Sequence, residues 1–222
     1  MANLRQLRTY AAEFLGTAGI VTAVTGAGFM VSNLGADGIV GLMVIAITVG
    51  AVLFGAISVL GPVSGAHLNP AVTLVMGLQK KISVMDSIGY VFFQILGGIS
   101  GAVVANLMFD SAWASTNDTV RAVGGSLLGE VVATFGLVFL VLMLIHYNQA
   151  QLIAAGVGTW VLAGHFFTSS TSFANPAVTV GRAFTDAITG IEWGSVLPFA
   201  AMQLLGGLLA LAAYKLIASS TM

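Results

Sequence analysis

Residues 69–73 read Asn-Pro-Ala-Val-Thr, and the same five residues recur at 175–179. Asparagine is a strong helix N-cap and proline is favoured at the first helical position, so each copy predicts the start of a helix. The apolar pieces 70–79 and 176–185 each hold about ten residues, or about 15 Å of helix, which is half a bilayer. One copy would indicate only a junction between a loop and a helix. Two copies in opposite halves of the chain predict two half-length helices that meet end to end.

The composition around these motifs is that of a membrane protein. Hydrophobic residues make up 58% of the 222 residues and charged residues 7%, whereas a soluble domain is about 25% charged. A soluble fold has too little interior to hide this much apolar surface, which excludes a water-soluble enzyme. The net charge of -1 excludes nucleic-acid binding through a basic surface. The absence of cysteine excludes a disulfide scaffold, a thiol nucleophile and a thiolate metal site, and we expect no metal or cofactor.

Apolar stretches between the charges predict six membrane spans, each long enough to cross a hydrocarbon layer about 30 Å thick. The predicted spans are 14–36, 39–60, 87–109, 122–145, 152–168 and 193–214. Six spans put both termini on one side of the membrane. That side then holds Arg5, Arg8, Lys80, Lys81 and Lys215, and the other side holds Arg121 and Arg182. Because basic residues gather in cytoplasmic loops, both termini are expected in the cytoplasm.

Further motifs recur in the same order in the two halves of the chain. A Glu-x-x-x-Thr-x-Gly pattern begins at Glu13 and again at Glu130, and a Gln-x-Leu-Gly-Gly pattern begins at Gln94 and again at Gln203. Small residues in and after the second pattern indicate close contacts between helices. These residues are Gly97, Gly98, Gly101, Gly206, Gly207 and Ala210.

The repeated motifs divide the chain into repeats of about 10–110 and 122–218. Each repeat holds three spans, an odd number, so the second repeat enters the membrane from the opposite face. We therefore expect an all-α membrane protein with a single channel domain over 1–222. Its fold is an inverted repeat, and its functional site lies where the two short pieces meet.

The chemistry of this meeting point favours a pore for uncharged solutes. The side-chain oxygen of Asn69 or Asn175 can cap its own helix, which leaves the NH₂ group free to donate into the space between the helices. Each helix start also carries about half a positive charge. Such a space repels cations and protons but accepts the oxygen atom of a neutral molecule.

The sequence resembles the aquaporin (major intrinsic protein) family over about residues 10–217. The residues that carry the resemblance are Ser64-Gly65-Ala66-His67-Leu68-Asn69-Pro70-Ala71, Asn175-Pro176-Ala177, Glu13 and Glu130. The resemblance implies six transmembrane helices, two re-entrant half-helices, and a homotetramer with one pore per subunit, here in the lipid bilayer of a bacterial inner (plasma) membrane. It also implies that the two glutamates brace the re-entrant loops. Carbonyl groups expected to line the pore are those of Gly65, Ala66, His67, Ser172, Phe173 and Ala174.

By the spacing usual in this family, the selectivity filter falls at Val49, Ala163, Ser172 and Val178. Nearly all members carry arginine at the position of Val178, so the resemblance implies a wide, neutral and weakly donating filter. Some bacterial aquaglyceroporins linked to arsenical resistance are similar in carrying valine there. The candidate solutes are therefore water, glycerol, arsenite and other metalloid hydroxides, and methylated arsenicals. A narrow, water-selective channel is the alternative.

Arg182 lies one helical turn beyond Val178, and two positions are open to it. Residues four apart share a helix face, so Arg182 can line the outer vestibule of the pore. Alternatively, its side chain extends toward the membrane surface and pairs with Asp186, again four residues away.

Two other classes of function compete with the channel. Ser64 and His67, with His146 and His165 elsewhere, raise an intramembrane serine protease, which needs a serine within reach of a histidine base. The second repeat does not repeat this serine–histidine pair before its motif, so we do not expect an enzyme. A closed pore with a structural or adhesive role is the other alternative.

Overall fold

A computed structural model describes residues 2–218, and the regular structure within this range is helical. The helices in chain order are α1 (Ala2–Asn33), α2 (Gly38–Ser64), α3 (Pro70–Leu78), α4 (Val84–Met108), α5 (Gly124–His146), the short 3-10 helix η1 (Ala150–Leu152), α6 (Ile153–Phe167), α7 (Pro176–Gly181), the 3-10 helix η2 (Arg182–Phe184) and α8 (Trp193–Ala218). Among the described residues, six helical segments are long and apolar enough to cross a membrane, and they correspond to the six predicted spans. Several helices extend further than predicted; α1, for example, continues over the charged residues before position 14.

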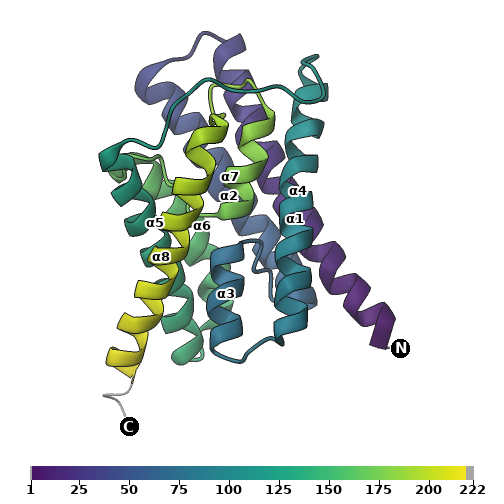
Figure 1. Ribbon diagram of the computed structural model, residues 1–222, viewed down its shortest axis with the longest axis vertical. Coiled ribbons are helices and arrows are strands. Elements are labelled where there is room, and N and C mark those ends of the chain that lie inside the picture. Colours follow the sequence, from purple (N-terminus) through teal and green to yellow (C-terminus); the bar gives the residue numbers. More distant parts are fainter. Residues whose placement is uncertain (1, 219–222) are drawn as a thin grey trace.

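The two half-helices also form where predicted, and they lie in opposite halves of the molecule (Figure 1). Helix α3 lies in the half that carries both ends of the chain, and α7 lies in the other half. We call the side of the molecule with both chain ends and α3 the terminal side, and the opposite side, with α7, the far side. The predicted second half-helix, 176–185, is an α-helix only as far as Gly181 and then tightens into η2.

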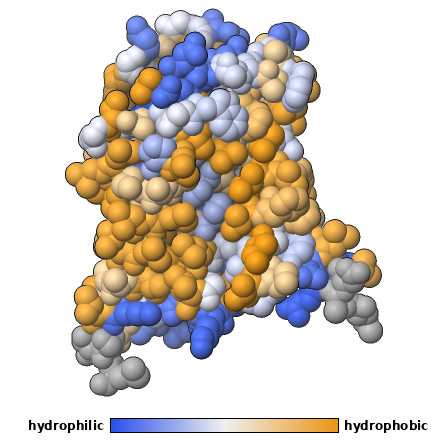
Figure 2. Space-filling model, in the orientation of Figure 1, coloured by the Kyte–Doolittle hydropathy of each residue, from blue (hydrophilic) through white to orange (hydrophobic). Residues whose placement is uncertain are grey.

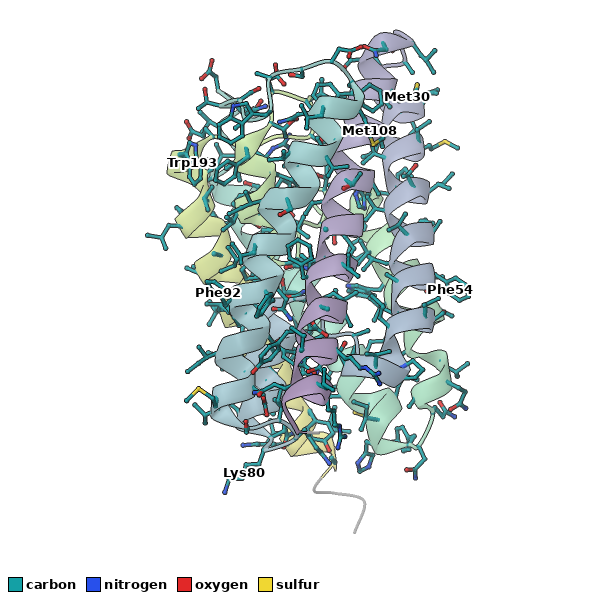
Figure 3. All side chains as sticks on the ribbon, turned by 90° about the vertical axis from the view of Figure 1, so that its right-hand side faces the viewer. Met30, Phe54, Lys80, Phe92, Met108 and Trp193 are labelled. Carbon is teal, nitrogen blue, oxygen red and sulfur yellow. The ribbon has the colours of Figure 1, made fainter. Side chains whose placement is uncertain are left out.

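The outer surface has the distribution of polarity that a membrane requires. On the face that Figure 2 shows, the middle of the molecule is mostly apolar, and hydrophilic residues lie at both ends. Phe54 and Phe92 are more than half exposed, and Figure 3 shows both pointing away from the bundle. So large an exposed apolar area is stable when lipid covers it, which confirms that the chain is an integral membrane protein.

Glycines bring helices into backbone contact within each repeat and also between the repeats. A Cβ atom on Gly97 or Gly101 would lie 2.3 Å from a carbonyl oxygen of α1, and one on Gly98 would lie 2.5 Å from the carbonyl oxygen of Ala177. In the second repeat, a Cβ on Gly206 would lie 2.6 Å from the carbonyl oxygen of Val131. These contacts confirm the predicted close packing, although Gly207 has room for a side chain at ordinary contact distance.

Glu13 holds the re-entrant loop that precedes α3. Its carboxylate accepts the backbone N–H of His67 at 3.0 Å and that of Leu68 at 2.6 Å. It also accepts the hydroxyl of Ser64 at 2.6 Å and the side-chain amide of Gln94 at 2.7 Å. Glu13 is fully buried, and four donors compensate for removing its carboxylate from water.

Glu130 repeats this arrangement in the second half. It accepts the backbone N–H of Phe173 at 3.0 Å and that of Ala174 at 2.9 Å, as well as the amide of Gln203. Each glutamine also donates to the threonine of the nearby five-residue motif, Gln94 to Thr73 and Gln203 to Thr179. The repeated Glu, Gln and Thr residues thus form the same hydrogen-bonded group twice, and each group ties a re-entrant loop to two full-length helices.

Replacing Glu130 by glutamine tests this bracing. In the variant, an NH₂ group replaces one carboxylate oxygen of Glu130 and faces an N–H donor that this oxygen accepted. Because the buried donor then loses its hydrogen bond, the change costs about 1–3 kcal/mol. We therefore expect Glu130→Gln to lower the thermal unfolding midpoint of the purified protein in detergent by several degrees. Asp118→Asn makes the same chemical change at an exposed carboxylate and should leave the midpoint unchanged. Equal shifts in the two variants would contradict the bracing role.

Candidate functional site

A cavity of about 590 Å³ lies between the two repeats, and both re-entrant loops contribute to its wall. Its lining includes Pro62, near the end of α2, and Gln151, in η1, toward the terminal side. It also includes His165, near the end of α6, and Arg182, at the start of η2, toward the far side. The remaining lining residues are mostly aliphatic side chains of α1, α2, α5 and α6. The cavity therefore runs along most of the membrane-spanning height of the molecule.

The backbone of the two loops is bent in the same unusual way. The residues one and three positions before each motif asparagine have positive φ: Ala66 (46°) and Leu68 (50°) in the first loop, and Ser172 (51°) and Ala174 (48°) in the second. Positive φ is uncommon for residues other than glycine, and it gathers at functional sites. At each of these residues, the positive φ rotates the peptide groups on either side relative to one another. The predicted carbonyl-bearing residues of both loops (Gly65, Ala66, His67, Ser172, Phe173 and Ala174) all line the cavity.

The two motif asparagines lie together in the cavity wall. Each caps its helix as predicted, because Asn69 Oδ1 accepts the N–H of Ala71 at 2.9 Å and Asn175 Oδ1 accepts that of Ala177 at 3.0 Å. Their NH₂ groups differ from the prediction, which left them free. Asn69 Nδ2 donates to the carbonyl of Ala174 at 2.8 Å, and Asn175 Nδ2 donates to that of Leu68 at 2.7 Å. One N–H of each amide therefore links the two loops, and the second N–H remains for the cavity.

Three of the four predicted filter residues line the cavity: Val49, Ser172 and Val178. Ala163 does not, because its side chain is exposed on the outer surface of α6, and its assignment to the filter is corrected. His165 takes this place in the wall. Two residues along a helix differ by about 200° in direction, so an assignment two residues early points to the opposite face.

His165 adds a polar group that the predicted filter lacks. Its Nδ1 lies 2.8 Å from the carbonyl of Val161. Because a carbonyl only accepts, Nδ1 carries the proton, and Nε2 of the neutral ring is left as an acceptor. Sequence analysis considered His165 only among the histidines of the serine protease alternative. The signal that could have identified it is that it is the single ionisable side chain in α6.

Arg182 lines the cavity at the far side and is 3% exposed. Its Nε donates to the carbonyl of Thr189, and its guanidinium carbon lies 3.3 Å from the centre of the Phe173 ring. It forms no ion pair with Asp186, whose carboxylate instead accepts the hydroxyl of Ser111 at 3.1 Å. The alternative in which Arg182 pairs with Asp186 is therefore wrong, and Arg182 lines the cavity at the far side. An imidazole and a cation therefore line the cavity beside the uncharged predicted filter residues Val49, Ser172 and Val178.

The serine and histidines that suggested a serine protease do not form a catalytic arrangement. Ser64 Oγ donates to Glu13 and accepts the N–H of Ala66, with no histidine partner among the described residues. His67 Nδ1 lies 3.1 Å from the hydroxyl of Thr73, and His146 packs against tyrosine rings at the end of α5. Ser64 therefore supports the loop instead of facing a base.

The sequence and the fold were compared with those of known proteins. A profile of the major intrinsic protein family matches residues 1–174. The chain is 42% identical over 205 residues to aquaglyceroporin AqpS of Rhizobium meliloti (strain 1021), covering 92% of this chain and 88% of that protein. It is 32% identical over 223 residues to a probable aquaporin of TIP type from Medicago truncatula, covering 95% and 87%.

Among solved structures, the X-ray structure of the aquaglyceroporin from Plasmodium falciparum superposes with a TM-score of 0.76 at 22% identity, covering 95% of this chain and 96% of that one. That likeness shows a shared fold of six membrane-spanning helices and two half-helices. The family profile and the relative at 42% identity show descent as well. The chain thus belongs to the major intrinsic protein family.

Proposed function

We propose that this protein is a passive channel of the aquaglyceroporin type for water and small uncharged solutes. The observation that carries the proposal is the cavity of about 590 Å³, lined by both re-entrant loops and by Asn69 and Asn175. Membership of the major intrinsic protein family and the likeness to AqpS support it. The solutes move down their gradients, and no covalent chemistry is involved.

The middle of the cavity is suited to neutral molecules and unfavourable for cations. Helices α3 and α7 both begin there, and each amide keeps one N–H for a solute oxygen. Carbonyl groups of the loops accept the hydroxyl hydrogens of the solute on either side. A cation would lose its hydration shell and meet donors and positive helix ends, so it is excluded.

The filter that we propose lies between this region and the far side. Val49 and Val178 give it apolar walls, and Ser172 lies in the same wall. The corrected fourth member, His165, offers an acceptor, and Arg182 offers donors just outside. An apolar wall with a few polar groups suits glycerol, which presents carbon on one face and hydroxyl groups on the other. Arsenite, other metalloid hydroxides and methylated arsenicals share the property of being small hydroxylated molecules, and we include them among the proposed solutes.

Orientation and assembly complete the proposal. Helices α1 and α8 bring the basic residues of both chain ends to the terminal side, and Lys80 lies there as well (Figure 3). By the positive-inside rule this side faces the cytoplasm, and the membrane is proposed to be a bacterial inner membrane. The apolar side faces of the bundle are compatible with lipid and with neighbouring copies in a homotetramer, each copy having its own pore.

Replacing Val178 by arginine tests the filter and the channel together. In liposomes the wild-type protein should conduct both glycerol and water. A guanidinium at Val178 would fill part of the cavity, so we expect glycerol permeability to fall about tenfold, equivalent to about 1.4 kcal/mol, and water permeability to fall much less. Stopped-flow light scattering measures both. Val120→Arg, at an exposed residue of the far-side loop, is the matched control and should change neither. Equal loss of water and glycerol flux would contradict the filter assignment.

A second pair of variants tests which face of α6 lines the filter. His165→Ala removes an acceptor and enlarges the cavity, so the permeability of a four-carbon polyol relative to water should rise severalfold. Ala163→Val adds volume two residues away on the exposed face and should leave this ratio unchanged. The same stopped-flow measurement applies. A ratio that responds to Ala163→Val and not to His165→Ala would restore the original assignment of Ala163.

A further inference from the structure

A smaller pocket of about 110 Å³ adjoins the main cavity at the far side. Its wall includes Arg121, Arg182, His165 and Thr171, and the other lining residues are Leu42, Ile45, Ile188 and Thr189. Arg182 and His165 also line the main cavity, so the two spaces share a wall at the outer mouth. The charged side chains that line this pocket are both arginines.

One loop holds the two guanidinium groups in place. Arg121 donates from Nη2 to the carbonyl of Ile188 at 2.8 Å and from Nε to that of Gly190 at 2.6 Å, and Arg182 donates from Nε to that of Thr189. Three consecutive carbonyls thus fix both side chains. Both guanidinium carbons also lie over the Phe173 ring, at 5.3 and 3.3 Å from its centre, so they are no farther apart than the sum of these distances.

Several donors of this pair have no partner within residues 2–218. A guanidinium has five N–H groups, and the bonds just described use two on Arg121 and one on Arg182. Both terminal amino groups of Arg182 and Nη1 of Arg121 make no hydrogen bond to the described chain. Arg182 is only 3% exposed and lines both spaces, and Arg121 lines the smaller one, so these groups are available to a ligand there.

The positive charge of the pocket is not balanced by a paired acid. Neither arginine forms an ion pair with a carboxylate of the described chain. Glu130 attracts both at a distance, but its oxygens accept donors from the loop and from Gln203. Asp186 and Glu192 accept serine hydroxyls instead. Two cations held over one ring repel each other, and a bound anion would reverse that repulsion.

We propose that this pocket binds a small carboxylate anion of about the size of formate at the outer mouth of the channel. A carboxylate accepts two parallel N–H bonds from one guanidinium, and the amino groups of Arg182 and Arg121 can supply such bonds together. The site goes beyond the proposed channel, because binding does not require flux. Where the protein conducts neutral solutes, an anion held beside Arg182 narrows their path, so formate slows their entry.

Thermal unfolding in detergent tests the binding directly, because a ligand that binds only the folded protein raises the midpoint with concentration. Sodium formate is compared with sodium chloride at equal ionic strength and neutral pH. We expect a midpoint that keeps rising with the logarithm of formate concentration above the dissociation constant, and no rise with chloride. The dissociation constant obtained for formate should increase about tenfold or more in Arg182→Gln. Lys81→Gln, which removes one positive charge at the terminal side, should behave as the wild type.

If Arg182→Gln does not fold, Arg121→Gln replaces it and should weaken formate binding in the same way. Arg121→Lys keeps the positive charge but loses the two parallel N–H groups of a guanidinium, so its affinity for formate should lie between those of the wild type and Arg121→Gln. Equal effects of formate and chloride, or unchanged formate binding in both arginine variants, would overturn the proposal.

In liposomes, formate should lower glycerol permeability in the wild type and not in Arg182→Gln. Binding that leaves glycerol flux unchanged would overturn the placement of the anion beside the solute path. That result would not contradict the proposed channel function. Conversely, absence of glycerol flux in the wild type would contradict the channel function but not the formate site.

Discussion

The re-entrant loops bring irregular backbone into the interior of a membrane protein, where no bulk water is present to bind its N–H groups. Glu13 and Glu130 provide the acceptors, each for two consecutive backbone N–H groups of one loop. Because these contacts fix the residues immediately before each motif asparagine, they also fix where the half-helices begin. The positive φ angles of the loops persist for the same reason, since the surrounding bonds leave the backbone no alternative.

The same constraint determines what the centre of the cavity can bind. With the loops fixed, Asn69 and Asn175 each give one N–H to the opposite loop and keep one for a solute. The cross-links hold the two half-helices at a constant separation, so the donors are already oriented when a solute arrives. This preorganisation explains how a largely apolar cavity conducts polar but uncharged molecules without a moving part in the proposed mechanism.

Most of the fold follows from local sequence features. The two Asn-Pro starts, the long apolar runs and the repeated order of motifs predict the six spans and both half-helices, because N-caps, prolines and hydropathy act over short distances. The position of filter residues depends instead on the length of the loop before Asn175, so counting back along the chain gave Ala163 where the structure has His165. The environment of Arg182 depends on the fold of residues 185–192, because the carbonyl of Thr189 in this segment accepts its Nε–H.

The central claim is that the paired asparagines and helix starts admit neutral solutes and exclude cations, and Asn175→Asp tests it most directly. Proteoliposomes containing wild-type protein should conduct glycerol with no increase in proton or potassium conductance over empty liposomes. An aspartate at this position places a negative charge in the cavity wall, so conductance for protons and potassium should appear while glycerol flux persists and reports a folded pore. Cation conductance in the wild type, or none in a variant that still conducts glycerol, would contradict the account.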